Sequence, residues 1–310
     1  MSAVLRWLGQ AMRGLRSFAY AEESPRPRVG LALGGGFARG IAHVGVIRAL
    51  NESGVPIDYI AGTSVGALIA AAYASGSTTE EMERQGSATR FRDFGRWTIS
   101  RMGMASNERL EDFLRKFTLL HRFEEMKIPL GIVATDLLTG RSAYFTKGEI
   151  GPALRASCAY PGLFLPIDVD DRVVVDGFLT ESVPAVCARH MGAQVVISVN
   201  LEPGLLHSRP RNTIEVISRS FSILQTTSHQ PWRDATDVLI EPDVHDVLWD
   251  EFVKTPQLVA AGMAATKAAL PKIRDVIAQR QHENSRGGGS RREPTRTASL
   301  REKERHVEAV

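Results

Sequence analysis

Between residues 28 and 200, short apolar runs alternate with longer stretches in which apolar residues recur at every third or fourth position. The short runs have the length and continuous apolar character of buried strands, and the longer stretches have the spacing of helices. Strands are expected at residues 29–33, 57–61, 130–137, 173–175 and 195–201. Helices are expected at residues 41–51, 67–74, 78–85 and 256–280. This alternation predicts a layered α/β fold with a mostly parallel sheet.

The two ends of the chain differ in character from this middle part. Residues 1–27 are interpreted as an amphipathic extension and linker, in which apolar residues at helical spacing are interrupted by arginines. The apolar positions include Leu5, Leu8, Met12 and Leu15, and the arginines are Arg6, Arg13 and Arg16. Such a segment suits peripheral contact of residues 1–20 with an anionic membrane, and it equally suits a helix docked on the protein's own core.

Three further segments complete the expected organisation. Residues 28–200 are expected to form the core of the domain, and residues 201–280 are expected to complete the same domain and to end in a helix. Residues 281–310 are rich in glycine, arginine and glutamate and poor in large apolar residues, so a disordered basic tail is expected.

Charge and cysteine content say more about the cellular compartment and the binding partners than about the reaction. The net charge of the 310 residues is +3, with much of the arginine near the two ends, so solvated ends and no nucleic-acid partner are expected. Cys158 and Cys187 lie in apolar or motif surroundings, which favours a reducing compartment. No stretch reaches the ~18 to 20 apolar residues of a membrane span, and no signal-peptide pattern opens the chain. A cytoplasmic protein, at most peripheral at the inner membrane face, is expected.

The most informative chemical signal is the pentapeptide Gly62-Thr63-Ser64-Val65-Gly66, which stands between a strand-like and a helix-like run. A G-x-S-x-G at such a junction is typical of a nucleophile elbow, where a sharp turn exposes the serine hydroxyl at the edge of the sheet. A Cβ atom at either glycine would clash in so tight a turn. Ser64 is therefore the candidate nucleophile, and the following helix N-terminus would favour developing negative charge.

A second signal is the run Gly34-Gly35-Gly36-Phe37-Ala38-Arg39-Gly40, directly after the first predicted strand. Three successive glycines allow backbone N–H groups to point into one concavity, so Gly34, Gly35 and Gly36 are candidate oxyanion-binding residues. A phosphate loop fits less well, because Arg39-Gly40-Ile41 stands where Gly-Lys-Ser/Thr is needed. A dinucleotide-binding loop also fits less well, because Arg39 occupies the position of its third glycine.

Four motifs in this order resemble the patatin-like phospholipases, most closely their small bacterial members. They are G-G-G-x-x-R-G at the glycine loop, G-x-S-x-G at the elbow, A-S-x-x-x-P from Ala156 to Pro161, and D-G at Asp176-Gly177. The resemblance implies a three-layer patatin-like fold, with helices flanking the central sheet. It also implies a serine acyl hydrolase without a cofactor, acting on phospholipids, lysophospholipids or other acyl esters.

The same resemblance assigns roles to two further residues. Asp176 would act as the base for Ser64 without a histidine, and Arg39 would support the glycine loop and add positive field. A solvated carboxylate is too weak a base for this task, so the site must desolvate Asp176 or otherwise raise its basicity.

The chain departs from the family pattern after its D-G motif. Phe178 stands where Gly or Ala is usual, and Thr180-Glu181-Ser182-Val183-Pro184 follows where Asn and prolines are common. A bulky Phe178 would narrow the substrate pocket or face the core. One alternative is therefore a lipid-binding or regulatory module with little turnover, and another is a lipid transacylase.

A third alternative is a Ser-Asp-His esterase whose base is one of four histidines. These are His190, His207, His229 and His245, none of which sits in a recognisable motif. No metal is expected, since no cluster of His, Cys and carboxylate residues has ligand spacing. Asp168, Asp170 and Asp171 are better explained by a turn before a strand.

Overall fold

The computed structural model describes residues 26–287, apart from residues 91–92, 94–95, 98–102, 107–108, 111–117, 202–208, 211–212 and 249–250. The membrane-contact helix expected within residues 1–20 lies outside the described residues, and so does His207. Residues 288–310, which make up most of the expected tail, also lie outside them.

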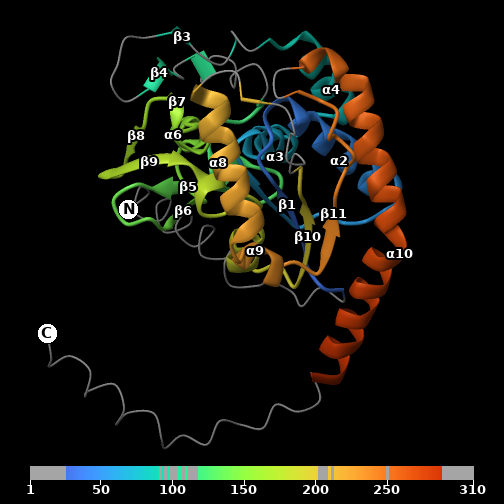
Figure 1. Cartoon of the computed structure of the whole chain (residues 1–310). Coiled ribbons are helices and arrows are strands. Elements are labelled where there is room, and N and C mark those ends of the chain that lie inside the picture. Colours follow the sequence, from blue (N-terminus) through green and yellow to red (C-terminus); the bar gives the residue numbers. More distant parts are fainter. Residues whose placement is uncertain are drawn as a thin grey trace, which may run out of the picture.

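A central sheet organises the described part of the chain (Figure 1). Its strands are β1 (Val29–Leu33), β2 (Tyr59–Thr63), β5 (Leu130–Asp136), β6 (Ser142–Phe145), β8 (Ile167–Val169), β9 (Arg172–Asp176), β10 (Val195–Val199) and β11 (Val238–Ile240). They follow the order β11-β10-β1-β2-β5-β9-β8, with β6 paired to β5. The neighbours from β11 to β5 pair in parallel, whereas β6, β8 and β9 pair in antiparallel fashion. The predicted mostly parallel sheet is therefore confirmed.

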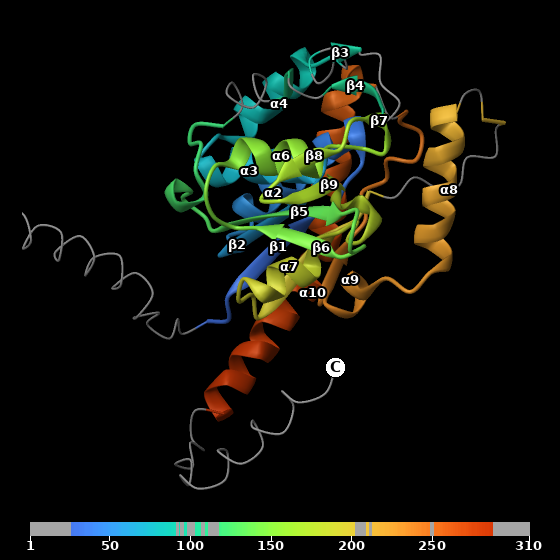
Figure 2. The same ribbon diagram turned by 90° about the vertical axis from the view of Figure 1, so that its left-hand side faces the viewer.

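Helices cover both faces of this sheet and give the three predicted layers. The helices whose bounds the structure describes are α2 (Ala42–Glu52), α3 (Val65–Ser75), α4 (Thr79–Ala88), α6 (Ile150–Ser157), α7 (Ala185–His190), α8 (Thr213–Thr227), α9 (Pro231–Asp234) and α10 (Thr255–Gly287). The core on one face contains residues of α2, α3, α6 and α10, and the core on the other face contains residues of α7 and α9. Figure 2 shows α3 and α6 above the sheet and α7 below it.

Shorter elements complete the described part. A small separate sheet contains β3 (Arg96–Trp97), β4 (Gly103–Ser106) and β7 (Gly162–Phe164). Single 3₁₀ turns are η1 (Phe37–Ile41), η3 (Phe123–Glu125), η4 (Gly177–Leu179) and η5 (Phe252–Lys254). No helix among the described residues is both long enough and apolar enough to span a bilayer.

The alternation of side chains along β1 explains why this strand is apolar throughout. Val29, Leu31 and Leu33 point into the core beneath α2 and α3, whereas Ala32 points into the core beneath α7. All five residues of β1 are buried, as expected for a parallel strand covered on both faces. In the sheet, β1 lies between β2, which follows it in the chain, and β10, which comes much later. The loop after β1 therefore lies at a topological switch point, where open α/β sheets bind their ligands.

Two local predictions can be followed residue by residue. The capping signal at Thr78 forms a capping box, in which its side chain accepts from the Glu81 N–H and the Glu81 carboxylate accepts from the Thr78 N–H. Asp170 and Asp171 form the turn between β8 and β9, both with positive φ. The acidic residues there are thus explained by a hairpin turn.

The last helix is longer than the sequence indicates. α10 was expected to end near residue 280, but it continues to Gly287. The polar residues 281–286 are exposed and compatible with a helix, and the helix ends where three consecutive glycines begin. Residues 281–287, which were assigned to the tail, therefore belong to α10.

Candidate active site

Ser64 occupies a sharp turn between β2 and α3. Its backbone has φ 55° and ψ −126°, a conformation that is unfavourable for a residue with a side chain. A Cβ atom on Gly62 would lie 2.3 Å from the Cα of Ala67, and one on Gly66 would lie 2.1 Å from the carbonyl oxygen of Leu33. Only glycine fits at either position, because the turn brings α3 against both β1 and β2.

The hydroxyl of Ser64 donates a hydrogen bond to Oδ2 of Asp176, with the two oxygens 2.7 Å apart. Asp176 ends β9, where it pairs with Ala134 of β5, and its Oδ1 accepts from the N–H of Phe178 at 2.9 Å. The side chain is buried, and this burial raises the pKa of Asp176 to about 7 against the opposing effect of its two hydrogen bonds. The desolvation that a carboxylate base requires is thus present.

The backbone of the elbow is held from below by Ser157, the last residue of α6. Its buried hydroxyl accepts from the N–H of Ser64 at 2.8 Å and donates to the carbonyl oxygen of Val133 at 2.6 Å. The thiol of the next residue, Cys158, lies beside Ser64 and Asp176, and burial raises its pKa well above the usual range. It is therefore a neutral thiol at physiological pH.

The glycine loop lies against Ser64, but its three N–H groups are not equivalent. Gly34 donates to the carbonyl oxygen of Val199 and Gly35 to that of Ser182, each at 3.1 Å. The N–H of Gly36 donates to no acceptor within the described residues. A Cβ on Gly35 would lie 3.6 Å from the Cβ of Ser64, which places the loop in contact with the elbow. Of the three candidate oxyanion donors, Gly36 is the one not already used.

Two basic side chains support this loop from behind. The Nε2 atom of His43, in the first turn of α2, lies 2.8 Å from the carbonyl oxygen of Gly34. Complete burial lowers the pKa of His43 to about 4, so the ring is neutral and Nε2–H is the donor. Arg39 donates to the carbonyl oxygen of Gly36 at 3.4 Å, and although burial lowers its pKa to about 10, it stays charged at neutral pH.

The residues that depart from the family pattern brace this site. The carbonyl oxygen of Glu181 accepts from the hydroxyl of Thr63 at 2.9 Å, and that of Ser182 accepts from Gly35. The Glu181 carboxylate is buried, which raises its pKa, and it accepts from the Tyr144 hydroxyl at 2.7 Å and from the N–H of Cys187 at 3.0 Å. This segment therefore has a structural role beside both the elbow and the glycine loop.

Phe178 belongs to a cluster of four aromatic rings beside the dyad. The ring of Tyr160 is the centre, with ring centroids 5.2 Å from Phe37, 6.1 Å from Phe178 and 6.0 Å from Phe221. Phe37 follows the glycine loop, Phe178 follows the D-G motif and Tyr160 lies in the A-S-x-x-x-P motif, whereas Phe221 comes from α8. Each of the three motif segments thus contributes one ring to the same apolar surface.

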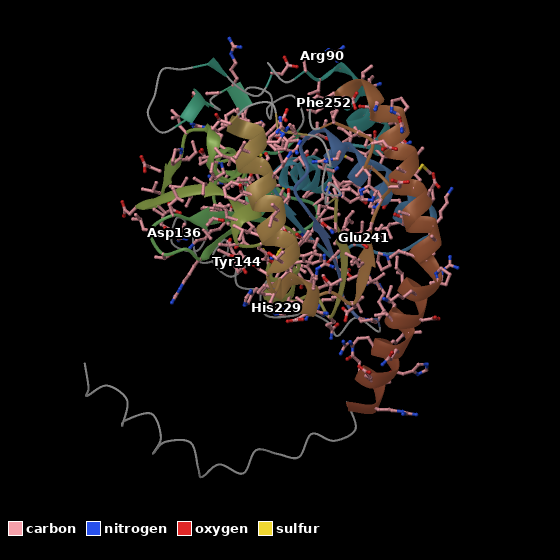
Figure 3. The ribbon with its side chains drawn as sticks, viewed as in Figure 1. Arg90, Asp136, Tyr144, His229, Glu241 and Phe252 are labelled. Carbon is pink, nitrogen blue, oxygen red and sulfur yellow. The ribbon has the colours of Figure 1, made fainter. Side chains whose placement is uncertain are left out.

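The described histidines give no support to a triad. Within the described residues, no histidine hydrogen-bonds to Ser64 or Asp176. The ring of His190 packs against Tyr144, with centroids 5.4 Å apart. His229, just past the end of α8, is exposed and pairs with Asp234 at 3.0 Å (Figure 3).

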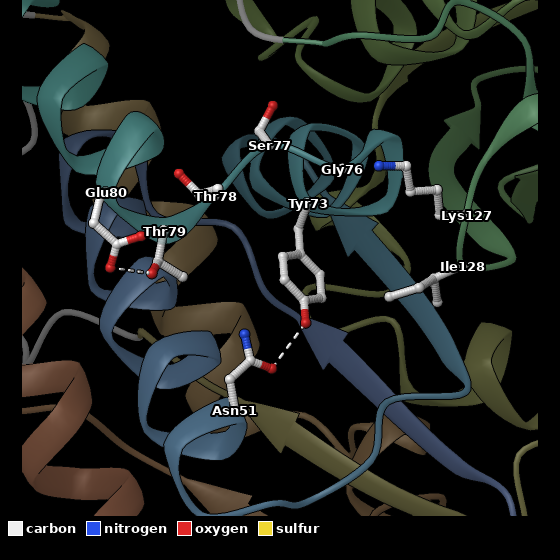
Figure 4. Close-up of a pocket in the computed structure, with 9 residues that line it drawn as sticks. All are labelled: Asn51, Tyr73, Gly76, Ser77, Thr78, Thr79, Glu80, Lys127 and Ile128. Carbon is white, nitrogen blue, oxygen red and sulfur yellow. Dashed lines mark hydrogen bonds between the residues drawn. The ribbon is translucent and has the colours of Figure 1, made fainter.

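A polar pocket of about 420 Å³ is found away from this site (Figure 4). It is lined by Asn51, Tyr73, Gly76, Ser77, Thr78, Thr79, Glu80, Lys127 and Ile128. These residues include the C-terminal end of α3, whereas Ser64 precedes its first residue, so the helix length of roughly 16 Å separates pocket and nucleophile. The N–H of Thr78 is already bound by Glu81, and the pocket contains none of the motif residues.

Fold and site together define a three-layer α/β protein in which a serine at a strand–helix elbow is hydrogen-bonded directly to a buried aspartate. The family model of the patatin-like phospholipases matches residues 31–188, just over half of the 310 residues. The chain belongs to this family.

Individual relatives are similar over part of their length. An uncharacterized NTE family protein of Mycobacterium tuberculosis is 40% identical over 181 residues, which are 57% of this chain and 50% of that protein. The lysophospholipase NTE1 of Mycosarcoma maydis is 33% identical over 233 residues, 70% of this chain and 12% of that protein. The crystal structure of VipD from Legionella pneumophila superposes with a TM-score of 0.48 at 14% identity, over 80% of this chain and 67% of that one. The chain spans about half the length of its mycobacterial relative.

Proposed function

We propose that this protein is a serine acyl hydrolase that cleaves ester bonds of phospholipids, lysophospholipids or related lipids. The observation that carries the proposal is the 2.7 Å hydrogen bond from Ser64 to a buried carboxylate whose pKa is about 7. Such a group is half deprotonated near neutral pH and basic enough to accept the serine proton. Family membership and the lysophospholipase among the similar proteins support a lipid ester as the substrate.

The reaction begins when the Ser64 hydroxyl gives its proton to Asp176 and attacks the ester carbonyl carbon. The carbonyl oxygen becomes an oxyanion, for which the N–H of Gly36 and the N-terminus of α3 are the proposed stabilising groups. Asp176 then protonates the departing alcohol, which leaves an acyl-serine. Water, deprotonated by Asp176, attacks this ester, and the fatty acid departs as the proton returns to Ser64.

In this scheme His43 and Arg39 are positioning residues. His43 holds the carbonyl of Gly34, and Arg39 holds the carbonyl of Gly36, so together they restrain the two peptides that flank the Gly35–Gly36 peptide, whose N–H is the proposed donor. Loss of an oxyanion donor such as the Gly36 N–H typically lowers the rate ~100- to 1000-fold.

The test is turnover of a short-chain acyl ester and labelling by a fluorophosphonate probe. Ser64→Ala should lose both labelling and turnover, and Asp176→Asn should lose turnover. Ser87→Ala and Asp168→Asn, which change exposed residues outside the site, are the matched controls and should retain both. Full turnover in Ser64→Ala or Asp176→Asn would reject the dyad.

The alternatives give different results in the same assay. A triad would require one of His190, His207, His229 or His245, so a folded but inactive alanine variant at one of them would favour it. A lipid-binding module would show wild-type turnover no higher than the Ser64→Ala background. A transacylase would form a new ester when a lysolipid or alcohol is added, which product analysis detects.

A further inference from the structure

Helix α8 has an unusual outer face. Val216 and Ile223 are each 49% exposed and Leu224 is 57% exposed, so α8 carries three of the eight large apolar side chains that are exposed in the described part. The exposed residues of α8 also include Thr213, Ser220, Thr226 and Thr227, and none of these outward residues is charged. Figure 2 shows α8 at the edge of the molecule, outside the two helical layers.

The two charged residues of α8 do not break this face. Glu215 and Arg219 are half-buried and pair with each other at 3.8 Å, one turn apart. Solvent-exposed helices normally carry charges on their outer face, and a contiguous apolar patch without them marks an interaction site.

The inner face of α8 contacts the catalytic segments. Phe221 packs against Tyr160 and Phe178, with ring centroids 6.0 and 6.3 Å apart, and the hydroxyl of Ser218 lies 3.0 Å from that of Tyr160. The side chain of Gln225 donates to the carbonyl oxygen of Phe178 at 2.8 Å. The N–H of the same Phe178 donates to Asp176, so one residue connects α8 to the base.

We propose that the outer face of α8 docks on the uncharged surface of a lipid bilayer, and that α8 thereby brings the aromatic cluster beside the dyad to the membrane. This rests on the proposed function, because a lipid acyl chain needs an apolar surface beside the dyad, and Phe178 of the aromatic cluster also donates its N–H to Asp176. The partner is a lipid surface because α8 lies against the segment that holds the proposed base, and the proposed substrate is a membrane lipid. The apolar and neutral face suits the interfacial region of a zwitterionic bilayer.

The neutrality of this face gives the proposal a specific signature. Binding through α8 should be insensitive to salt, since no exposed charge is involved. Contact through the arginines of residues 1–20 would instead require anionic lipid and weaken as salt rises. Vesicles of phosphatidylcholine alone therefore isolate the contribution of α8 in the full-length chain.

The experiment measures sedimentation of the full chain with phosphatidylcholine vesicles, at low and high salt, in the Ser64→Ala background so that no lipid is consumed. The double variant Ile223→Glu/Leu224→Glu should partition at least about tenfold more weakly, because two half-exposed apolar side chains can no longer insert. Leu138→Glu, at a residue 77% exposed on the β5–β6 turn, is the matched control and should partition as the parent does. Equal partition of all three proteins would overturn the proposal.

Turnover provides a second readout in the protein with Ser64 intact. The α8 double variant should hydrolyse a soluble short-chain ester at the parental rate and phosphatidylcholine vesicles at least about tenfold more slowly. If the parent hydrolyses no ester but still binds neutral vesicles through α8, the proposed function fails and the docking surface stands. Light scattering tests whether the face serves self-association instead. If the parent is a dimer that does not bind vesicles, and the double variant is a monomer, the face is a dimer interface and the proposal is overturned.

Discussion

The hydroxyl of Ser157 accepts a hydrogen bond from the backbone N–H of Ser64 at 2.8 Å, and it donates one to the carbonyl oxygen of Val133 at 2.6 Å. It thereby ties the nucleophile elbow to strand β5, beside the strand that delivers Asp176. These two hydrogen bonds explain why the A-S-x-x-x-P motif contains a serine at this position. A small side chain with both a donor and an acceptor is needed beneath the elbow.

Ser157→Ala should therefore damage the elbow as well as the stability. The N–H of Ser64 and the carbonyl of Val133 would both lose their partner, at a cost of about 1–3 kcal/mol in the free energy of unfolding. A shift of the nucleophile should lower kcat by up to about 100-fold with little change in KM. Ser75→Ala is the matched control, because the Ser75 hydroxyl also bridges a carbonyl and an N–H but at the far end of α3. If both variants lost stability equally and kept full kcat, Ser157 would have no positioning role.

The strained backbone of Ser64 leads to a prediction about two inactive variants. Ser64→Ala keeps a side chain at φ 55°, whereas Ser64→Gly removes the conflict between Cβ and backbone. Relief of a conformation that costs about 1–3 kcal/mol should exceed the added chain entropy of glycine, about 0.5–1 kcal/mol. Ser64→Gly should thus unfold at a higher denaturant concentration than Ser64→Ala. The reverse order would show that the elbow is not strained.

Much of the fold could be predicted because its parallel strands are covered on both faces. Continuous apolar runs marked β1, β5, β9 and β10 to within about two residues. β2 was placed two residues early, at 57–61 instead of Tyr59–Thr63. Gly62 and Thr63 pair with Ile132 and Val133 of β5, and this ladder extends the strand into the elbow despite the glycine.

The site was less accessible to sequence reasoning, because its contacts join distant segments. Ser64 and Asp176 are 112 residues apart, and their pairing was inferred only through the family resemblance. The sequence analysis does not single out His43, although a histidine in the otherwise apolar first half of α2, just after the glycine loop, is a usable signal. The engagement of Gly34 and Gly35 depends on Val199 and Ser182, which no local pattern connects to the loop.

In the proposed mechanism, the pKa of Asp176 sets the pH dependence of activity. Burial raises this pKa to about 7, and only the deprotonated form can accept the Ser64 proton. We expect kcat/KM for a soluble ester to rise with pH through about 7 and then level off. A pH–rate profile of the wild-type protein, with Asp168→Asn as a control that should not move it, measures the midpoint. A rise centred near the ordinary value of 3.8 would contradict a buried base.

The same burial predicts that Asp176→Asn is inactive but more stable than the wild type. The folded-state pKa of Asp176 is raised from 3.8 to about 7, so between these values the folded protein binds more protons than the unfolded chain. Stability attributable to this group therefore falls as pH rises through that window and stays low above it.

Asparagine cannot ionise, so Asp176→Asn escapes this penalty. The difference in unfolding free energy between variant and wild type should be near zero at about pH 4 and approach about 4 kcal/mol above about pH 7, the equivalent of that pKa rise. His43, whose pKa burial lowers from 6.5 to about 4, adds an opposite slope, but it is present in both proteins and cancels. Denaturant unfolding across this pH range measures the difference, with Asp168→Asn as the exposed-carboxylate control. A variant no more stable than wild type at high pH would mean that the ionised carboxylate is fully stabilised in the fold, and Asp176 would then be too weak a base for Ser64.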